Sequence, residues 1–206
     1  MIKKNLLLIG AGGHAKSCIE VIEECGEFKI SGIIGLPGEV GKKILGYDVI
    51  GSDDDLLVLS TSHQHALIAL GQVHTPKYRI GLYESLVGFG YQLPTIVSPK
   101  AKVSRHAIIG DGTIIMHGTV INACVKIGIN CIINSLSLIE HDVFVGDHCH
   151  ISTGVILNGN SSVGRGSFMG SRSVVKDGVS IGSECIIGMG VCVRKNLLNS
   201  STYTGD

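Results

Sequence analysis

Aliphatic side chains recur at every sixth position through the second half of the chain. The series runs from Val97 to Val193, and each of its seventeen members is Val, Ile, Leu or Met. These residue types make up about a third of the chain, so chance would produce the run with a probability on the order of 10⁻⁸. A small side chain precedes most members by two residues, as at Thr113 and Cys131. The pattern predicts short strands, each with a large and a small residue inside, that form the faces of a triangular coil.

Glycine adds a second period to this pattern. It follows every third aliphatic position, at Gly110, Gly128, Gly146, Gly164 and Gly182. The spacing of eighteen residues indicates that three faces complete one coil, with glycine relieving the steric cost of a bend. We therefore predict a parallel β-helix of hexapeptide repeats over residues 96–206, with a rise of ~4.8 Å per coil. The pattern does not determine the handedness of the coil.

The residue just before each aliphatic is expected to point outward from the coil. Two faces are largely apolar on the outside, and the third is mixed. The apolar positions are Ile114, Ile132, His150, Phe168 and Ile186 on one face and Val120, Leu138, Ile156, Val174 and Cys192 on the next. Exposed apolar stripes of this size usually mark an interface. Two adjacent apolar faces fit a three-fold assembly, so the sequence predicts a homotrimer.

Residues 1–95 have a different hydrophobic pattern, in which apolar runs are separated by glycine-containing turns. The expected elements are strands at 4–10, 28–35 and 65–71 and helices at 14–26 and 76–90. In the first helix, Cys18, Ile19 and Ile22 share one face. Strands that alternate with helices predict a small parallel α/β domain in front of the coil.

A glycine turn joins the first strand of this domain to its first helix. Gly10, Gly12 and Ala15 fit the pattern G-x-G-x-x-[GA]. Backbone N–H groups at such a turn, together with the helix N-terminus, can hold a phosphate group. Dinucleotide-binding folds place an acidic residue at the end of the next strand, but here that strand ends in IIGLPG around Gly35. A dinucleotide is therefore not expected, while another phosphate-bearing ligand and a purely structural turn both stay open.

Composition and charge narrow the function classes. Lys+Arg and Asp+Glu number 17 each, so no basic field argues for nucleic acid. No apolar run approaches the ~18 residues that span a bilayer, and no leader segment is visible, so membrane insertion is not expected. Seven cysteines without a CxxC pair fit reduced thiols in a cytoplasmic protein.

The segment NSLSLIEHDVFVGDHCHISTG, residues 134–154, carries the candidate chemistry. His141 lies two residues past Ile139, so it is expected at a corner, pointing away from the core. The adjacent Asp142 could orient its imidazole. With an ordinary pKa near ~6.5, imidazole is suited to accepting a proton at neutral pH. From the spacing alone, a general base and a solvated surface histidine both stay open.

A zinc site and a non-catalytic scaffold are the alternatives for this segment. Some hexapeptide β-helices are zinc carbonic anhydrases, which need three converging histidines. His148 and His150 are expected on one outer face, where they could chelate weakly. Cys131, Cys149 and Cys185 occupy small inward positions and are interpreted as core residues.

The whole chain resembles bacterial sugar acetyltransferases of the NeuD/PglD type. The resemblance runs nearly end to end and rests on IGAGGHAK, ALIALG, LPTIVSPKAKVS and NSLSLIEHDVFVGDHCHISTG. It implies a Rossmann-like domain over residues 1–95 that binds a nucleotide sugar, then a left-handed β-helix over residues 96–206 that binds acetyl-CoA. We therefore expect an acetyl-CoA-dependent sugar acetyltransferase of glycan biosynthesis that needs no metal.

The resemblance also implies site residues. His141 corresponds to the family's general base and Asp142 to the acid that raises its basicity. The acetyl-CoA contacts map to His150, Ser171 and Met189, and the nucleotide-sugar contacts map to Gly12, Gly13, His14, Gly35, Leu36, Pro37 and Gly71. Two departures put part of these contacts in question. Relatives often carry an acid near Gly35, and the sequence ends in NSSTYTGD rather than the Pro-Ala-basic ending usual in the family.

The expected acceptor is the 4-amino group of a UDP-type nucleotide-linked sugar. A phosphate-type glycine turn with His14 beside it suits a nucleotide better than a free sugar. O-acetylation of sialic acid is the alternative, because O-acetylating relatives share these motifs.

Overall fold

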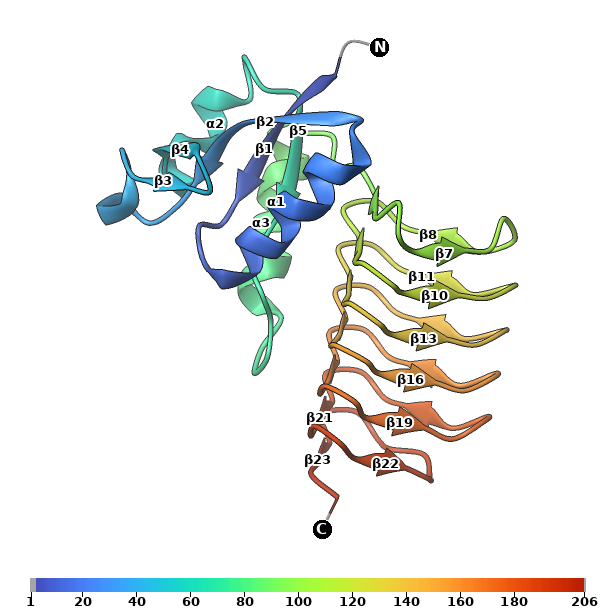
Figure 1. The fold of residues 1–206 in the computed structure, drawn as a ribbon. Coiled ribbons are helices and arrows are strands. Elements are labelled where there is room, and N and C mark those ends of the chain that lie inside the picture. The colour runs from blue at the N-terminus through green and yellow to red at the C-terminus, as the bar shows by residue number, and fades with distance from the viewer. Residues whose placement is uncertain (1–2, 206) are drawn as a thin grey trace.

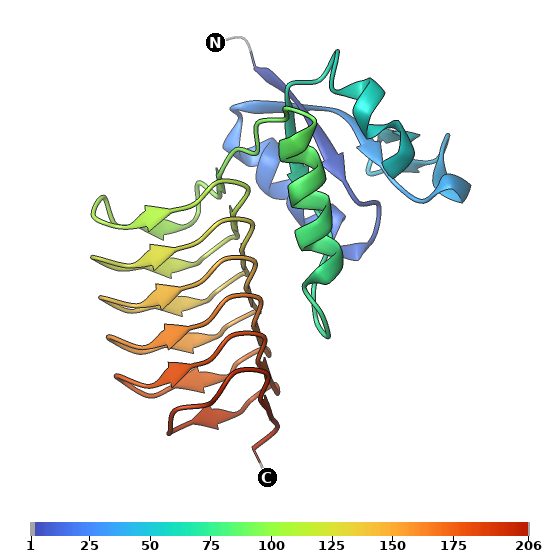
Figure 2. The ribbon, with the colours of Figure 1, turned by 180° about the vertical axis from the view of Figure 1, so that it is seen from behind.

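A computed structural model describes residues 3–205 and shows two parts that differ in architecture (Figure 1). The front unit extends from β1 (Lys4–Ile9) to α3 (Lys77–Gly88), and the coil extends from β6 (Ile96–Val97) to β23 (Thr202–Tyr203). The coil is a stack of triangular turns, and the front unit lies beside its upper turns. Figure 2 shows the same arrangement from behind, with α3 running along the stack.

The front unit is built on a five-stranded sheet with the order β3-β4-β2-β1-β5. The remaining strands are β2 (Phe28–Ile34), β3 (Lys43–Ile44), β4 (Tyr47–Gly51) and β5 (His65–Ile68). Strands β1, β2, β4 and β5 are parallel, whereas β3 pairs antiparallel with β4. The three predicted strands are confirmed. The β3-β4 pair is an addition that the hydrophobic pattern did not predict.

Helices cover both faces of this sheet. The other helical segments are α1 (Gly13–Cys25), α2 (Leu56–Leu59) and two short 3-10 turns at Pro37–Glu39 and Asp53–Asp55. Leu6 and Leu8 of β1 share a core cluster with α1, while Leu7 and Ile9 share one with α2 and α3. This alternation follows from the two-residue period of a strand. Both predicted helices are confirmed. None of the helices described over residues 3–205 is long and apolar enough to cross a membrane.

The coil is a left-handed parallel β-helix with three faces. Face 1 is the sheet β23-β21-β18-β15-β12-β9-β6, face 2 is β22-β19-β16-β13-β10-β7, and face 3 is β20-β17-β14-β11-β8. Strands pair with the strand eighteen residues along, as Leu138 does with Ile156, except at the last turn, where Ile186 of β21 pairs with Thr202 of β23. The other strands of face 1 are β9 (Ile114–Ile115), β12 (Ile132–Ile133), β15 (His150–Ile151), β18 (Phe168–Met169) and β21 (Ile186–Ile187). Those of face 2 are β7 (Lys102–Val103), β10 (Val120–Ile121), β13 (Leu138–Ile139), β16 (Ile156–Leu157), β19 (Val174–Val175) and β22 (Cys192–Val193). Those of face 3 are β8 (Ile108–Ile109), β11 (Lys126–Ile127), β14 (Phe144–Val145), β17 (Ser162–Val163) and β20 (Ser180–Ile181).

The interior of the coil is filled as the six-residue period predicts. The second residue of each strand points inward, and Ile133, Ile151 and Met169 are all 0% exposed. The small residues two positions earlier are buried beside them. Several of their polar atoms donate to carbonyl oxygens of the following coil, as Thr113 Oγ1 does at 2.9 Å and Ser167 Oγ at 2.9 Å. Where the small residue is polar in this way, its side chain satisfies a backbone acceptor of the neighbouring coil.

The glycines of the eighteen-residue period serve a different purpose from the predicted one. Gly110 and Gly164 do not have a left-handed backbone. A Cβ on Gly110 would lie 2.6 Å from the carbonyl carbon of Gly128, and a Cβ on Gly164 would lie 2.5 Å from that of Gly182. Glycine is needed because successive coils approach closely there, so the explanation by a bend is wrong. The left-handed residue lies two positions later, as at Asn130 with φ 53°.

The upper part of face 1 is covered by the front unit of the same chain. Ile114 and Ile132 are 1% and 0% exposed, and they share a core cluster with Ile19 and Ile22 of α1. The prediction that this face is an open apolar stripe for another subunit is therefore wrong for these positions. An outward apolar residue looks the same in the sequence whether its own chain or a partner covers it.

Buried hydrogen bonds tie the front unit to the corner between faces 3 and 1. Arg79 of α3 is 2% exposed and donates from Nη2 to the carbonyl oxygen and Oδ1 of Asn130 at 2.9 and 2.7 Å. Gln72 Nε2 donates to the carbonyl oxygens of His148 and Gly166 at 3.1 and 3.2 Å. Each of these groups would be costly to leave unpaired in the interior, so the network favours one docked arrangement.

Candidate active site

His141 and Asp142 form a hydrogen-bonded pair on an exposed corner of the coil. The corner joins β13 on face 2 to β14 on face 3. His141 Nδ1 lies 2.9 Å from Asp142 Oδ2. A carboxylate only accepts, so Nδ1–H donates and Nε2 keeps its lone pair. The side chains are 64% and 57% exposed, which leaves Nε2 open to a reactant arriving from outside the coil.

The surroundings of His141 increase its affinity for a proton. The hydrogen bond to Asp142 raises the pKa of His141, and the negative charges of Asp142, Glu140 and Asp177 raise it further. Glu140 is held in place by Asn122, whose Nδ2 donates to Oε2 at 2.8 Å. An imidazole oriented by a carboxylate is suited to taking a proton from an attacking nucleophile.

His150 lies on face 1, buried against the front unit rather than on the open surface. It is 7% exposed, and its Nδ1 lies 2.6 Å from the carbonyl oxygen of Gln72. Nδ1–H must therefore donate, which leaves a lone pair on Nε2. The ring of His14, at the start of α1, lies beside it with 6.4 Å between ring centroids. Within residues 3–205, Nε2 of both rings is buried without a hydrogen-bond partner, and such atoms are costly unless a ligand or water satisfies them.

Both of these buried histidines are neutral near pH 7. Burial lowers the pKa of His14 to about 3, with smaller effects of Arg79 and His150. Burial also lowers the pKa of His150 to about 4, against the opposing hydrogen bond to Gln72. His14 and His150 can therefore accept hydrogen bonds through Nε2, whereas His141 is the histidine of the site that is poised to gain a proton.

A cavity of about 310 Å³ lies at the glycine turn of the front unit. Four of the residues predicted to bind the acceptor line it, namely Gly12, Gly35, Leu36 and Pro37. A Cβ on Gly12 would meet no atom within 4 Å, so the turn faces open space. The helix N-terminus at Gly12 has no side-chain cap, so its N–H groups are available to an anion.

Sequence reasoning missed the acidic side of this cavity. Glu39, Asp53 and Asp54 also line it, together with Tyr78 of α3. Tyr78 Oη donates to Asp53, and Glu39 Oε2 accepts from the N–H of Leu36 at 2.8 Å. The end of β2 lacks the acidic residue that dinucleotide-binding folds carry there. Acidic side chains line the cavity from two neighbouring loops instead. The run of three aspartates at 53–55 was the available signal, but it follows β4, a strand that was not predicted.

Gly13 is the first residue of α1, and the other predicted residues, Gly71, Ser171 and Met189, lie near face 1. Gly71 lies beside His14, since a Cβ on Gly71 would be 3.8 Å from the Cβ of His14. Ser171 and Met189 follow β18 and β21, at the corner between faces 1 and 2. Ser171 Oγ lies 2.9 Å from Ser152 Oγ, and Met189 is 81% exposed.

The structure therefore brings the predicted residues together in two places rather than one. One place is the front cavity together with face 1 and its adjoining corner. It holds residues predicted to bind the nucleotide sugar, and also His150, Ser171 and Met189. His141 and Asp142 lie at the corner between faces 2 and 3, which is the corner opposite face 1. Within one chain, the body of the coil separates the two groups.

The histidines of residues 134–154 were also the candidate ligands for zinc. Within residues 3–205, no group of three or more His, Cys, Asp or Glu side chains is arranged to hold a metal ion. His148 is buried, with Nδ1 accepting from Asn130 Nδ2 at 3.0 Å and its ring 5.5 Å from that of Tyr83. The expectation that His148 and His150 share an open outer face is wrong, because the front unit covers both. Cys131, Cys149 and Cys185 are buried in the coil core, as interpreted.

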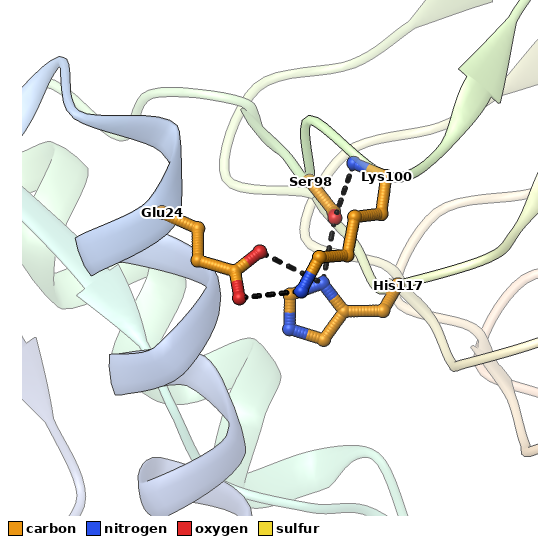
Figure 3. Close-up of polar contacts among 4 residues, drawn as sticks. All are labelled: Glu24, Ser98, Lys100 and His117. Carbon is orange, nitrogen blue, oxygen red and sulfur yellow. Dashed lines mark hydrogen bonds and ion pairs between the residues drawn. The ribbon is translucent and has the colours of Figure 1, made fainter.

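A second cluster, at the junction of α1 with the first coils, has the residue types of a hydrolase triad but not its geometry (Figure 3). Ser98 Oγ lies 2.7 Å from His117 Nδ1, and Glu24 Oε2 lies 3.8 Å from the same nitrogen. A relay needs the acid and the serine on opposite ring nitrogens. Ser98 is also 1% exposed. Together with the Lys100–Glu24 ion pair at 2.7 Å, this cluster joins α1 to the coil.

Comparison with known proteins finds two families along the chain. Residues 5–86 match the family described as the PglD N-terminal domain, and residues 161–195 match the hexapeptide repeat of succinyl-transferase. No curated protein sequence matches the chain.

Solved structures match over nearly the full length. One is a variant of perosamine N-acetyltransferase from Caulobacter crescentus in complex with CoA and GDP-perosamine. It is 32% identical, with a TM-score of 0.90 over 96% of this chain and 92% of that chain. Another is the acetyltransferase domain of PglB from Neisseria gonorrhoeae in complex with acetyl coenzyme A. It is 28% identical, with a TM-score of 0.89 over 98% of this chain and 96% of that chain. WeeI from Acinetobacter baumannii, at 23% identity and a TM-score of 0.85, shares the fold.

Proposed function

This chain belongs to the PglD-type family of sugar acetyltransferases, and from that membership we propose that it transfers the acetyl group of acetyl-CoA to an amino group of a nucleotide-linked sugar. The observation that carries the proposal is the exposed His141–Asp142 pair, with Nε2 free to accept a proton. We assign nucleotide-sugar binding to residues 1–95 and acetyl-CoA binding to residues 96–206. A cytoplasmic location fits the seven cysteines, all of which are free thiols.

His141 acts as the general base in this proposal. As the acceptor nitrogen forms its bond to the acetyl carbon, Nε2 takes the proton that the nitrogen loses. As the carbon–sulfur bond breaks, Nε2 can return that proton to the departing thiolate. Asp142 holds the ring through Nδ1 and stabilises its charged form. No covalent acyl-enzyme is required, because the thioester already supplies an activated acetyl group.

The residues along face 1 are assigned to the co-substrate. Among the described residues, His150 Nε2 is a buried acceptor without a partner, so a donor from a bound molecule would satisfy it. Ser171 offers a hydroxyl and Met189 an exposed apolar side chain at the same edge. These groups fit the mixed amide and apolar character of the pantetheine arm of acetyl-CoA.

A complete site is proposed to need two copies of the chain, arranged in a homotrimer. His141 lies opposite face 1 and cannot meet its own front cavity. Face 2 offers a contact surface, because Val120, Leu138, Ile156 and Val174 are only partly buried. A three-fold arrangement through this face would carry His141 of one protomer towards face 1 of its neighbour.

An amine acceptor is preferred over the hydroxyl of sialic acid. The front cavity has a phosphate-type turn, which a nucleotide needs and free sialic acid does not. The test is thiol release from acetyl-CoA with GDP-linked and UDP-linked 4-amino sugars and, separately, with sialic acid and its CMP form. Release only with sialic acid would overturn the amine acceptor and keep acetyl transfer. Release with none of them would overturn the proposed function.

The turn at Gly12 provides a test of the acceptor site. Gly12→Val should raise KM for the nucleotide-linked sugar by about tenfold or more, because the added side chain would occupy the space in front of the backbone N–H groups. Since no atom lies within 4 Å of the new Cβ, the fold should tolerate the change. Gly88→Val, at an equally open position of α3, is the matched control and should keep the wild-type KM. Equal losses in the two variants, or a loss of acetyl-CoA binding in Gly12→Val, would contradict this assignment.

The pH dependence should report the titration of His141. A base works when neutral, so kcat/KM should fall as the pH drops through its pKa. Because Asp142 raises the pKa of His141, the midpoint of this fall, which forms the acidic limb of the plot of kcat/KM against pH, should lie above the ordinary histidine pKa of about 6.5. Asp142→Asn should move the limb down towards about 6.5 and lower kcat modestly. His14 and His150 titrate at about 3 and about 4 and so do not shape this limb. An unmoved limb in Asp142→Asn would show that another group controls it.

A further inference from the structure

The imidazole of His141 lies against Gly159, one coil further along. Strand β13 pairs with β16 so that Ile139 faces Leu157, which places residue 141 on residue 159. A Cβ on Gly159 would lie 2.8 Å from Nε2 and 2.8 Å from Cε1 of His141, and 3.4 Å from Nδ1. Cβ atoms do not come within 3.0 Å of another heavy atom without something shifting. The ring therefore occupies the space that any side chain at 159 would need.

The fold itself does not require glycine at this position. The equivalent residues of the other coils are Arg105, Ala123, Asp177 and Lys195, all of which carry a Cβ. Gly159 does not have a left-handed backbone. The left-handed residue of this corner is the next one, Asn160, with φ 55°. The reason for glycine at 159 is thus found in its neighbour His141 and not in the bend of the chain.

We infer that Gly159 is a positioning residue for His141, a role that rests on the proposed function of His141 as the base. Asp142 holds the ring at Nδ1, and the bare backbone of Gly159 lies under the opposite edge, at Nε2 and Cε1. The two contacts together set the direction of the Nε2 lone pair.

Gly159→Ala should displace the ring without unfolding the chain. The side chain of His141 is 64% exposed, so it can swing outwards and relieve the contact. A shift of about 1 Å in a catalytic group can cost up to ~10²-fold in rate. We expect kcat to fall about 10- to 100-fold, while KM for both substrates stays within about threefold. In the displaced position the ring no longer forms its hydrogen bond with Asp142, which raises the pKa of His141. The acidic limb of the kcat/KM profile should therefore move down towards about 6.5.

Gly178→Ala is the matched control. It lies at the same corner one coil further along, and its Cβ would meet no atom within 4 Å. Its left-handed φ of 68° makes alanine slightly strained there, so this control includes the backbone cost that Gly159→Ala lacks. It should keep the wild-type kcat and pH limb.

A double-mutant comparison separates positioning from a general packing defect. In a His141→Ala background the collision partner is gone, so Gly159→Ala should then change neither the residual rate nor the Tm. Wild-type kcat and pH limb in the single variant would overturn the inference. An equal loss of kcat in Gly178→Ala would overturn it as well. So would a fall of Tm caused by Gly159→Ala in the His141→Ala background, because the imidazole is absent there. The proposed function fails separately, if the wild-type chain releases no thiol with any acceptor.

Discussion

Replacement of His141 by alanine is expected to lower kcat by about 10²–10⁴, the contribution that a positioned general base typically makes. The expectation follows from the open Nε2 and the hydrogen bond of Nδ1 to Asp142 at 2.9 Å. The side chain of His141 is 64% exposed, so its loss leaves no cavity in the core. The measurement is the steady-state rate of thiol release with a nucleotide-linked 4-amino sugar.

Acetyl-CoA binding is the control for this variant. His150, Ser171 and Met189 are assigned to co-substrate binding and His141 to proton transfer, so the Kd for acetyl-CoA should be unchanged by calorimetry. His141→Asn should lose as much activity as His141→Ala, since an amide keeps polarity without basicity. Turnover near the wild-type rate in either variant would remove His141 from the role of base.

Replacement of Ile132 by aspartate is expected to destabilise the whole chain. Ile132 is 0% exposed and packs in the cluster that joins α1 to the coil. An unpaired carboxylate there costs several kcal/mol. For a chain of this size, that corresponds to a fall in Tm of roughly 10 °C. Thermal unfolding followed by circular dichroism gives the measurement.

Leu138→Asp is the matched change on face 2. Leu138 is also the first residue of a coil strand, but it is only partly buried. The folded chain should tolerate aspartate there, while the proposed trimer should dissociate in light scattering. If Ile132→Asp kept its Tm, the docking of the front unit on face 1 would be contradicted. A trimer that survived Leu138→Asp would place the subunit contact elsewhere.

The coil could be predicted from the sequence because its geometry is local and repeated. The aliphatic at every sixth position, the small residue two before it and the eighteen-residue glycines each correspond to one contact between neighbouring coils. His141 could be recognised for the opposite reason, because its residue type differs from those at the equivalent position of the neighbouring coils. The residues at the equivalent position of the coils on either side, Ala123 and Gly159, are small. The repeat therefore does not require histidine at this position.

The docking of the front unit could not be predicted in the same way. The apolar side chains of Ile114 and Ile132 indicate only that an apolar surface packs on face 1. They do not indicate whether that surface belongs to the same chain or to another subunit. Asp53 and Asp54 of the front cavity were missed because they follow β4, which forms a hairpin with β3, a strand of two residues. A strand that short leaves no periodic signal, so Asp53 and Asp54 read as an ordinary charged loop.

The eighteen-residue pairing register also restricts how the length of such a chain can change. A one-residue insertion within a strand would shift the pairing around it and turn inward residues outward. One extra coil below β22 would leave His141 and the front unit untouched. One extra coil between Asn130 and His148, which hold Arg79 and Gln72 on successive coils, would pull those two attachments apart by ~4.8 Å. Natural length variants are therefore expected to differ by whole coils, added or lost at the end of the stack that lies away from the front unit.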